Sequence, residues 1–222
     1  MSARFTLFAG HYGSGKTNVA LAYARRLRRT GAAVAVADLD IVNPYFRTKD
    51  SAASLAAEGI SLIASGFANT NVDFPALPKE IYGLLGPEAP KTVMDVGGDD
   101  RGALALGRYA PEIVASGDYE MLAVVNASRP LTRTPEDAVA TLREIELAGG
   151  IAFTGVVNNT NLGPDTDAAT VLRSRPYAEA VAAALSLPLR FTACDERLAP
   201  ELAGRVPDLL PLALQRRCWL GE

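Results

Sequence analysis

A glycine-rich run that ends in a lysine and a threonine is the part of this sequence with the clearest chemistry. Residues 10 to 17 read GHYGSGKT and fit the pattern G-x-x-x-x-G-K-[ST]. An apolar run of strand length precedes the pattern, and a segment with helical spacing follows it. Backbone N–H groups in such a loop converge on a phosphate, and the following helix adds its positive N-terminal dipole end. The sequence therefore predicts a phosphate-binding loop.

The residue types in the loop fit specific roles. Gly13 and Gly15 allow backbone angles that only glycine adopts easily and let the chain approach a phosphate closely. Lys16 is expected to bridge the β- and γ-phosphates and serve catalysis, and the Thr17 hydroxyl is expected to bind magnesium. A glycine-rich turn that binds nothing would not require this lysine and hydroxyl in register. The residues expected to contact a nucleotide here are Gly10, His11, Tyr12, Gly13, Ser14, Gly15, Lys16, Thr17 and Asn18.

Carboxylates at the ends of two apolar runs are the expected partners of this loop. Asp38 and Asp40 end the run AAVAVADLD, and Asp95 follows KTVM and begins a D-x-x-G pattern that ends at Gly98. Ligands collect at the carboxyl ends of strands in open α/β sheets. We expect Thr17, Asp38 and Asp95 to serve the magnesium ion, and the Gly98 N–H to sense a γ-phosphate. Alternatively, each carboxylate caps a neighbouring helix or loop.

The elements that must position these residues alternate along the chain. Buried apolar runs separated by segments of helical period favour parallel strands covered on both faces, hence a three-layer, doubly wound α/β fold. In the first expected helix Val19, Tyr23 and Leu27 form one apolar stripe. We expect one nucleotide-binding domain over residues 1–222. The expected strands lie in residues 4–9, 32–40, 91–98, 119–126, 151–159 and 187–193.

Composition excludes several function classes. The net charge of −3 gives no general attraction to nucleic acid. Cys194 and Cys218 are too few for a disulfide framework and lack metal-ligand spacing, which favours a reducing compartment. No run approaches the roughly 20 apolar residues that a membrane span needs, and no signal core forms at the N-terminus. We expect a cytoplasmic protein.

In sequence order, GHYGSGKT, DLDIVNP, DVGG and VVNN resemble the MinD/ParA group of P-loop ATPases, over roughly residues 4 to 195. The resemblance implies a mainly parallel sheet, MgATP as ligand and often a dimer formed face to face across two nucleotides. By position it implies that Asp40 orients the attacking water and that Asn158 hydrogen-bonds the adenine edge. Asn158 could instead be a turn residue closing a strand. No N-K-x-D guanine motif ends a strand, so adenine is expected over guanine.

The second and third loop residues depart from that family. Many members have a lysine directly after the first glycine, and it reaches the partner subunit's phosphates. His11 stands there in this chain, and Tyr12 stands where a small glycine is usual. Histidine is shorter and only partly charged near neutral pH. Either these residues pack beside the loop, or His11 is a phosphate ligand or a pH-sensitive gate.

Other segments bear on what the protein acts upon. Arg129 and Arg133 precede a helix expected to begin after Thr134, and Arg47 follows the Asp40 strand. Such arginines could contact an anionic substrate or partner, or be solvated loop charges. Residues 65–80 are expected to form a loop or lid. The leucine-rich segment 206–222 is expected to pack against the core or a partner, with membrane binding as the alternative.

Two functions follow from these observations, and a nucleotide-binding module with no useful turnover is a third alternative. The first is a nucleotide-switched protein that hydrolyses ATP slowly to ADP and phosphate and acts on an unidentified protein partner. The second is a small-molecule kinase or ATP-dependent ligase on the same scaffold, of the CobB or dethiobiotin synthetase kind. A substrate pocket beside the γ-phosphate would distinguish the second from the first.

Overall fold

The computed structural model describes residues 2–40, 49–64, 80–86, 88–98 and 100–213. Arg47, nearly all of the expected loop at 65–80 and the end of the leucine-rich tail lie outside them. The strands are β1 (Phe5–Ala9), β2 (Val34–Leu39), β3 (Ile60–Ala64), β4 (Lys91–Val96), β5 (Tyr119–Val125), β6 (Gly155–Asn158), β7 (Leu189–Asp195) and β8 (Leu209–Leu212). The α-helices are α1 (Lys16–Arg29), α2 (Lys49–Ala57), α3 (Glu80–Leu84), α4 (Asp100–Gly107), α5 (Ala110–Ala115), α6 (Pro135–Gly149), α7 (Ala168–Leu185) and α8 (Ala199–Leu202).

The strands form one eight-stranded sheet in the order β3-β2-β4-β1-β5-β6-β7-β8, and every described pair is parallel. The chain leaves β1 toward β2 on one side and later leaves β4 toward β5 on the other. The direction of winding therefore reverses at β1, and ligands bind beside the carboxyl ends of strands at such a switch point. The loop that follows β1 lies at this position.

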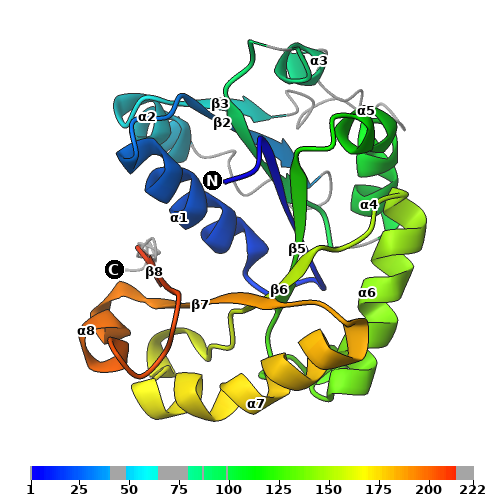
Figure 1. Ribbon diagram of the computed structural model, residues 1–222. Helices are drawn as coiled ribbons and strands as arrows, with labels where there is room; N and C mark the ends of the chain where they lie inside the picture. Colours follow the sequence, from blue (N-terminus) through cyan, green and yellow to red (C-terminus); the bar gives the residue numbers. More distant parts are fainter. Residues whose placement is uncertain (1, 41–48, 65–79, 87, 99, 214–222) are drawn as a thin grey trace, which may run out of the picture.

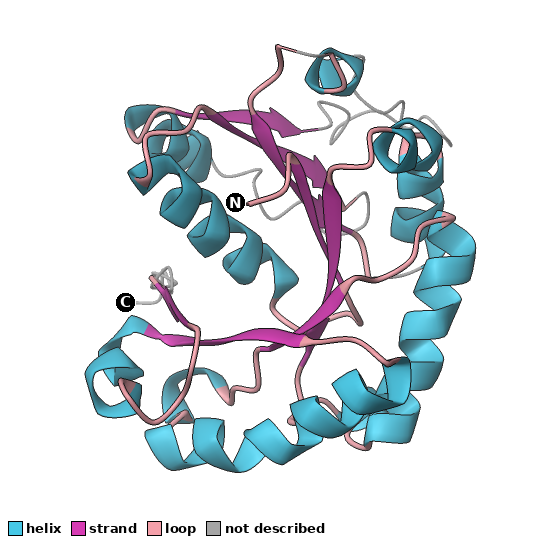
Figure 2. Cartoon of the chain, viewed as in Figure 1, coloured by secondary structure: helices cyan, strands magenta, loops and turns pink. Residues whose placement is uncertain are grey.

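Helices cover both faces of the sheet, which confirms the expected three-layer, doubly wound fold. Figure 1 shows α1 and α2 on one side of the sheet and α4, α5 and α6 on the other, and Figure 2 shows the same layers by element type. One core cluster joins α1 to the sheet, and a second joins the sheet to the helices α3 to α7. Each strand near the centre is therefore buried on both faces, as its continuous apolar run predicts.

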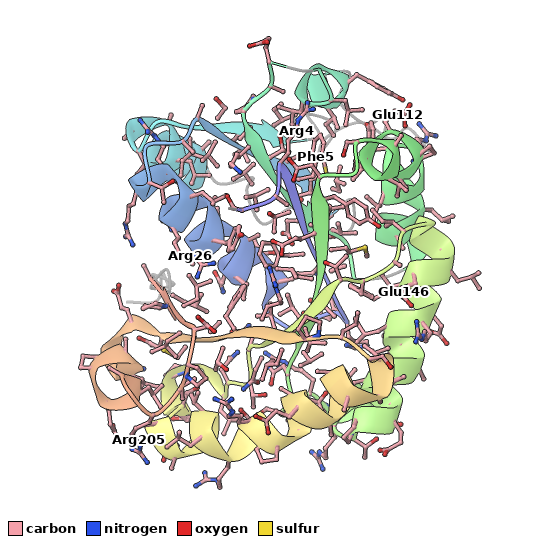
Figure 3. All side chains as sticks on the ribbon, viewed as in Figure 1. Arg4, Phe5, Arg26, Glu112, Glu146 and Arg205 are labelled. Carbon is pink, nitrogen blue, oxygen red and sulfur yellow. The ribbon has the colours of Figure 1, made fainter. Side chains whose placement is uncertain are left out.

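Helix α1 packs through the stripe that its spacing predicts. Val19, Tyr23 and Leu27 are all buried. The Tyr23 ring stacks on Phe191 of β7 with centroids 6.0 Å apart. The guanidinium of Arg26, a residue labelled in Figure 3, lies 4.7 Å from the Tyr23 centroid. Since α1 is anchored to the sheet along its length, its first residues are held at the end of β1.

Two strands were not expected from the sequence. β3 comes directly after α2 and pairs with β2. β8 contains Pro211 and lies at the edge of the sheet beside β7, where a residue without a backbone N–H is tolerated. Leu210 and Leu212 of β8 are buried, so this part of the leucine-rich tail packs against the core as expected.

Candidate phosphate-binding site

The backbone of the loop between β1 and α1 has the conformation that its glycines allow. Gly13 and Gly15 have φ angles of 76° and 85°, in the left-handed region that favours glycine. Gly15 is the N-terminal cap residue of α1, and no side chain of the cap bonds the first N–H groups of the helix. These donors are thus available to a ligand, and an anion is the partner that the helix dipole favours.

The D-x-x-G segment after β4 packs directly against this loop. A Cβ atom at Gly98 would lie 2.7 Å from the Gly10 carbonyl oxygen and 2.8 Å from the Tyr12 nitrogen. Any residue larger than glycine would therefore displace the loop. The structure brings Gly98 to the loop, where its sequence position predicts it.

Two charged groups and a hydroxyl meet at the start of α1. Lys16 Nζ lies 3.4 Å from Asp40 Oδ2, and both side chains are buried. The Thr17 hydroxyl donates to Asp95 Oδ2 at 2.5 Å. The Asp40 N–H donates to Asp38 Oδ1 at 2.9 Å. The side chains expected to provide catalysis and magnesium binding are thus gathered in one cluster.

Two carboxylates of this cluster, Asp38 and Asp95, are unfavourable as buried anions when no metal ion is bound. Asp38 and Asp95 are paired in register on β2 and β4. Burial, together with the charge of Asp95, raises the pKa of Asp38 to about 7. Burial also raises the pKa of Asp95 to about 6, although the charge of Lys16 and the hydrogen bond from Thr17 oppose the shift. A bound cation would favour the charged form of both groups.

Asp95 has a further feature that fits a metal ion. Its Oδ1 atom is buried and has no hydrogen-bond partner among the described residues. Within the described ranges no group of three or more His, Cys, Asp or Glu side chains could hold a metal by itself. Mg²⁺ is commonly held by one or two carboxylates together with substrate phosphates and water, so the Thr17 and Asp95 pair fits Mg²⁺ bound with a nucleotide.

The ion pair and hydrogen bonds of this cluster do not include His11 or Tyr12. His11 Nδ1 lies 2.8 Å from the Tyr12 carbonyl oxygen, and it must be the donor because a carbonyl oxygen only accepts. Tyr12 is 63% exposed. The histidine is thereby bound to its own loop, and the tyrosine projects from it.

Amide side chains replace carboxylates on the other side of the loop. The Asn159 amide donates to the Ser14 carbonyl oxygen at 2.7 Å, and a Cβ atom at Gly15 would lie 2.3 Å from Asn159 Nδ2. A pocket beside the loop is lined by Gly15, Asn18 and Asn161 and extends to the end of β7. A base attached to phosphates in the loop would have this pocket within reach. Asn159 and Asn161 were not expected at the site from the sequence, although Asn159 belongs to the VVNN segment and Asn161 follows that segment by two residues.

Asn158 is oriented differently from what the resemblance implies. Its side chain has no exposed surface, its amide donates to the Ser174 hydroxyl on α7 at 2.9 Å, and its oxygen accepts from the Thr160 N–H at 3.2 Å. It does not line the pocket. The structure therefore gives Asn158 a role in joining β6 to α7 and does not bring it to the loop as a base ligand.

Comparisons with known proteins support the fold. No family model matches the sequence, and no curated protein matches it. Among solved structures, FtsY from Thermotoga maritima has a TM-score of 0.60 at 15% identity, covering 88% of this chain and 63% of that one. FtsY from Mycoplasma mycoides has a TM-score of 0.57 at 15% identity, covering 85% and 60%.

A third similar structure is described with a nucleotide. The signal recognition particle 54 kDa protein from Aeropyrum pernix K1, in complex with GDP, has a TM-score of 0.56 at 17% identity and covers 86% of this chain and 41% of that one. This chain thus spans less than two thirds of the length of these proteins. Together with the loop geometry, the likeness shows that the chain has the P-loop nucleoside triphosphatase fold. The described residues include no helix with the length and apolarity that crossing a bilayer requires.

Proposed function

We propose that this chain binds MgATP in a single nucleotide-binding domain, hydrolyses it slowly, and uses the nucleotide state as a switch for a partner protein. One observation carries the proposal: a buried lysine, a threonine hydroxyl and three aspartates meet at the end of a glycine loop. Burying several charges is costly unless they are paired or bind a ligand. A phosphate-bound cation would satisfy the carboxylates, and the phosphates would satisfy the lysine and the loop N–H groups.

The proposed roles follow from these contacts. Lys16, which is paired with Asp40 in this structure, would turn to the phosphates. Thr17, Asp95 and Asp38 would hold Mg²⁺, which supplies positive charge to the transferring phosphoryl group when it is bound. Asp40 would orient the attacking water. Gly98, which packs closely against the loop, would respond to the γ-phosphate through its N–H.

The base is proposed to be adenine, recognised by Asn161 in place of Asn158. The Asn161 amide donates to the Asn159 carbonyl oxygen at 2.8 Å, and its oxygen accepts from the Gly163 N–H at 3.2 Å. A carboxamide has two N–H donors and two lone pairs, so one donor and one acceptor remain. Adenine presents a donor N6 amine beside an acceptor ring nitrogen, which matches that pair. The related protein described with GDP makes this specificity the first property to measure.

If the protein forms a nucleotide-dependent homodimer, we propose that no loop residue reaches across to the partner subunit's phosphates as the family's lysine does. His11 is bonded to the backbone of its own loop, and Tyr12 is exposed beside it. Contacts between two copies would therefore have to accommodate the tyrosine and use other surfaces.

The proposal is tested by titrating the purified protein with MgATP and comparing it with Lys16→Ala. Loss of a hydrogen bond to a charged group costs about 1.5 to 3 kcal/mol, so affinity should fall about 10-fold or more. Calorimetry that gives the same affinity for both proteins would overturn the phosphate site. Phosphate release should also be stimulated by cell extract, whereas a phosphorylated metabolite would identify the kinase or ligase instead.

A further inference from the structure

Arg129 lies over the phosphate-binding loop. It follows β5 in a tight turn, in which the Arg129 N–H donates to the Asn126 carbonyl oxygen at 3.2 Å. A Cβ atom at Gly13 would lie 3.4 Å from Arg129 Nε, 3.6 Å from its Cζ and 3.7 Å from its Cδ. The guanidinium group therefore packs on the loop at the position where Gly13 has no side chain.

The Arg129 side chain has no acceptor of its own in the described part of the chain. Its Nε atom is buried and makes no hydrogen bond, and the side chain takes part in no ion pair there. Several other arginines are paired with a carboxylate, for example Arg25 with Glu58. Arg129 also lines the pocket that contains Gly15 and Asn18. A buried donor without an acceptor is costly, and an anionic ligand would supply the acceptor.

The turn that carries Arg129 is fixed to the neighbouring loop after β6. The fully buried Asn126 side chain accepts from the Ser128 N–H at 2.9 Å and from the Asn161 N–H at 3.4 Å. The Ala127 N–H donates to the Thr160 hydroxyl oxygen at 3.0 Å. Since both loops are joined in this way, the arginine is positioned before any ligand arrives, which lowers the ordering cost of binding.

We propose that Arg129 is a binding residue for the phosphate chain of the nucleotide and acts within its own subunit, in addition to Lys16. The inference rests on the proposed nucleotide function. A guanidinium is always charged and presents several donors that match phosphate oxygens. It would supply from the β5 loop a permanent positive charge that His11 does not supply from the phosphate loop itself.

The test is equilibrium binding of fluorescent MgADP to the whole chain and to variants. Arg129→Gln should weaken binding about 10-fold, because a charge-assisted hydrogen bond is lost. Arg129→Lys should retain part of the affinity because it retains the charge. Arg205→Gln makes the same charge change on an exposed side chain that pairs with Glu201, and it should bind as the unmodified protein does. Circular dichroism without nucleotide checks that each variant is folded.

The outcomes separate this inference from the function on which it rests. Equal affinity of Arg129→Gln and Arg205→Gln, with binding lost in Lys16→Ala, would overturn the role of Arg129 and leave the nucleotide site intact. Unchanged binding in Lys16→Ala would overturn the nucleotide site itself. Arg129→Gln should lower the affinity for ADP and for GDP by the same factor, because the two nucleotides have the same phosphate groups. A loss with one base only would overturn the phosphate contact in favour of a base contact.

Discussion

The two sides of the loop at Gly10 to Thr17 are built from different chemistry. On the side of β2 and β4, buried charges face one another: Lys16 pairs with Asp40, and Asp38 lies in register with Asp95. On the side of β5 and β6, amides join the loops, as Asn159 does with Ser14, and the Arg129 guanidinium packs against Gly13. Charges suit a ligand that carries phosphate and metal, whereas amides suit a ligand with a fixed pattern of donors and acceptors. The difference leads to the prediction that nucleotide affinity and base specificity depend on separate residues.

The largest effect is expected when a carboxylate is removed from the side of β2 and β4. Asp40→Ala should lower single-turnover ATP hydrolysis by about 100- to 10,000-fold, the usual contribution of a general base or a positioned water. His11→Ala should cost less, because His11 is bonded to the Tyr12 carbonyl oxygen of its own loop. Both variants are measured at saturating MgATP after binding has been checked. Hydrolysis that survives in Asp40→Ala but disappears in His11→Ala would reverse the two roles.

A second prediction concerns how far the buried Asp38 and Asp95 carboxylates lower the free energy of unfolding when no ligand is bound. The pKa values of Asp38 and Asp95 are raised from 3.8 to about 7 and about 6. At a pH between the pKa values of the unfolded and folded states, the folded protein binds more protons than the unfolded chain. The free energy of unfolding of the nucleotide-free protein therefore falls as pH rises. The stability that the protonated aspartates contribute is fully lost once the pH exceeds their pKa in the folded protein. Asp38→Asn should therefore stabilise the nucleotide-free protein at pH 8, on the order of 2 kcal/mol.

Asp167 provides the matched control for this measurement. It caps α7 by accepting from the Thr170 N–H at 2.7 Å. Hydrogen bonds from the Thr170 side chain and from this N–H hold the pKa of Asp167 below its ordinary value. Its contribution to stability is therefore present at neutral pH and lost as pH falls. Denaturant unfolding across pH should show Asp167→Asn destabilised at pH 8 and Asp38→Asn stabilised. An Asp38→Asn variant that is less stable than the unmodified protein at pH 8 would contradict the stated cost.

The smallest effect is expected when a carboxylate replaces an amide on the side of β5 and β6. Asn161→Asp replaces an amide, which can donate and accept, with a carboxylate that only accepts. Guanine presents adjacent N–H donors, so the preference for ATP over GTP should shift toward GTP by about 10-fold, the value of roughly one good hydrogen-bond pair. Competition between the two nucleotides measures the shift. A preference for GTP in the unmodified chain, or no shift in the variant, would remove Asn161 from the base site.

Much of the charged side could be predicted from the sequence because each feature is local. The glycine pattern specifies the turn, and buried apolar runs place Asp38 and Asp95 at strand ends. The orientation of Asn158 could not be predicted, because it depends on Ser174 of α7, which is distant in sequence. The position of Arg129 over Gly13 likewise depends on how the turn after β5 is bonded to the loop after β6.

The missed strands have physical reasons of their own. β3 is a five-residue run separated from α2 by only Glu58 and Gly59, and so short a run is easily taken for part of the loop after the helix. β8 contains Pro211, and proline is usually evidence against a strand. β8 is positioned at the edge of the sheet by pairing with β7 and by the packing of Leu210 and Leu212 in the core cluster of α1.

Pro211 also affects how the sheet meets other molecules. The Asp208 carbonyl oxygen accepts from the Thr192 N–H of β7, so the backbone groups of alternate residues from Asp208 onward face β7. The backbone groups of Pro211 therefore face away from β7, and proline has no N–H to offer on that side. An incoming strand would find a donor missing from its template, and exposed sheet edges promote aggregation by offering such templates. This side of the protein should therefore resist the addition of strands from other chains at high concentration.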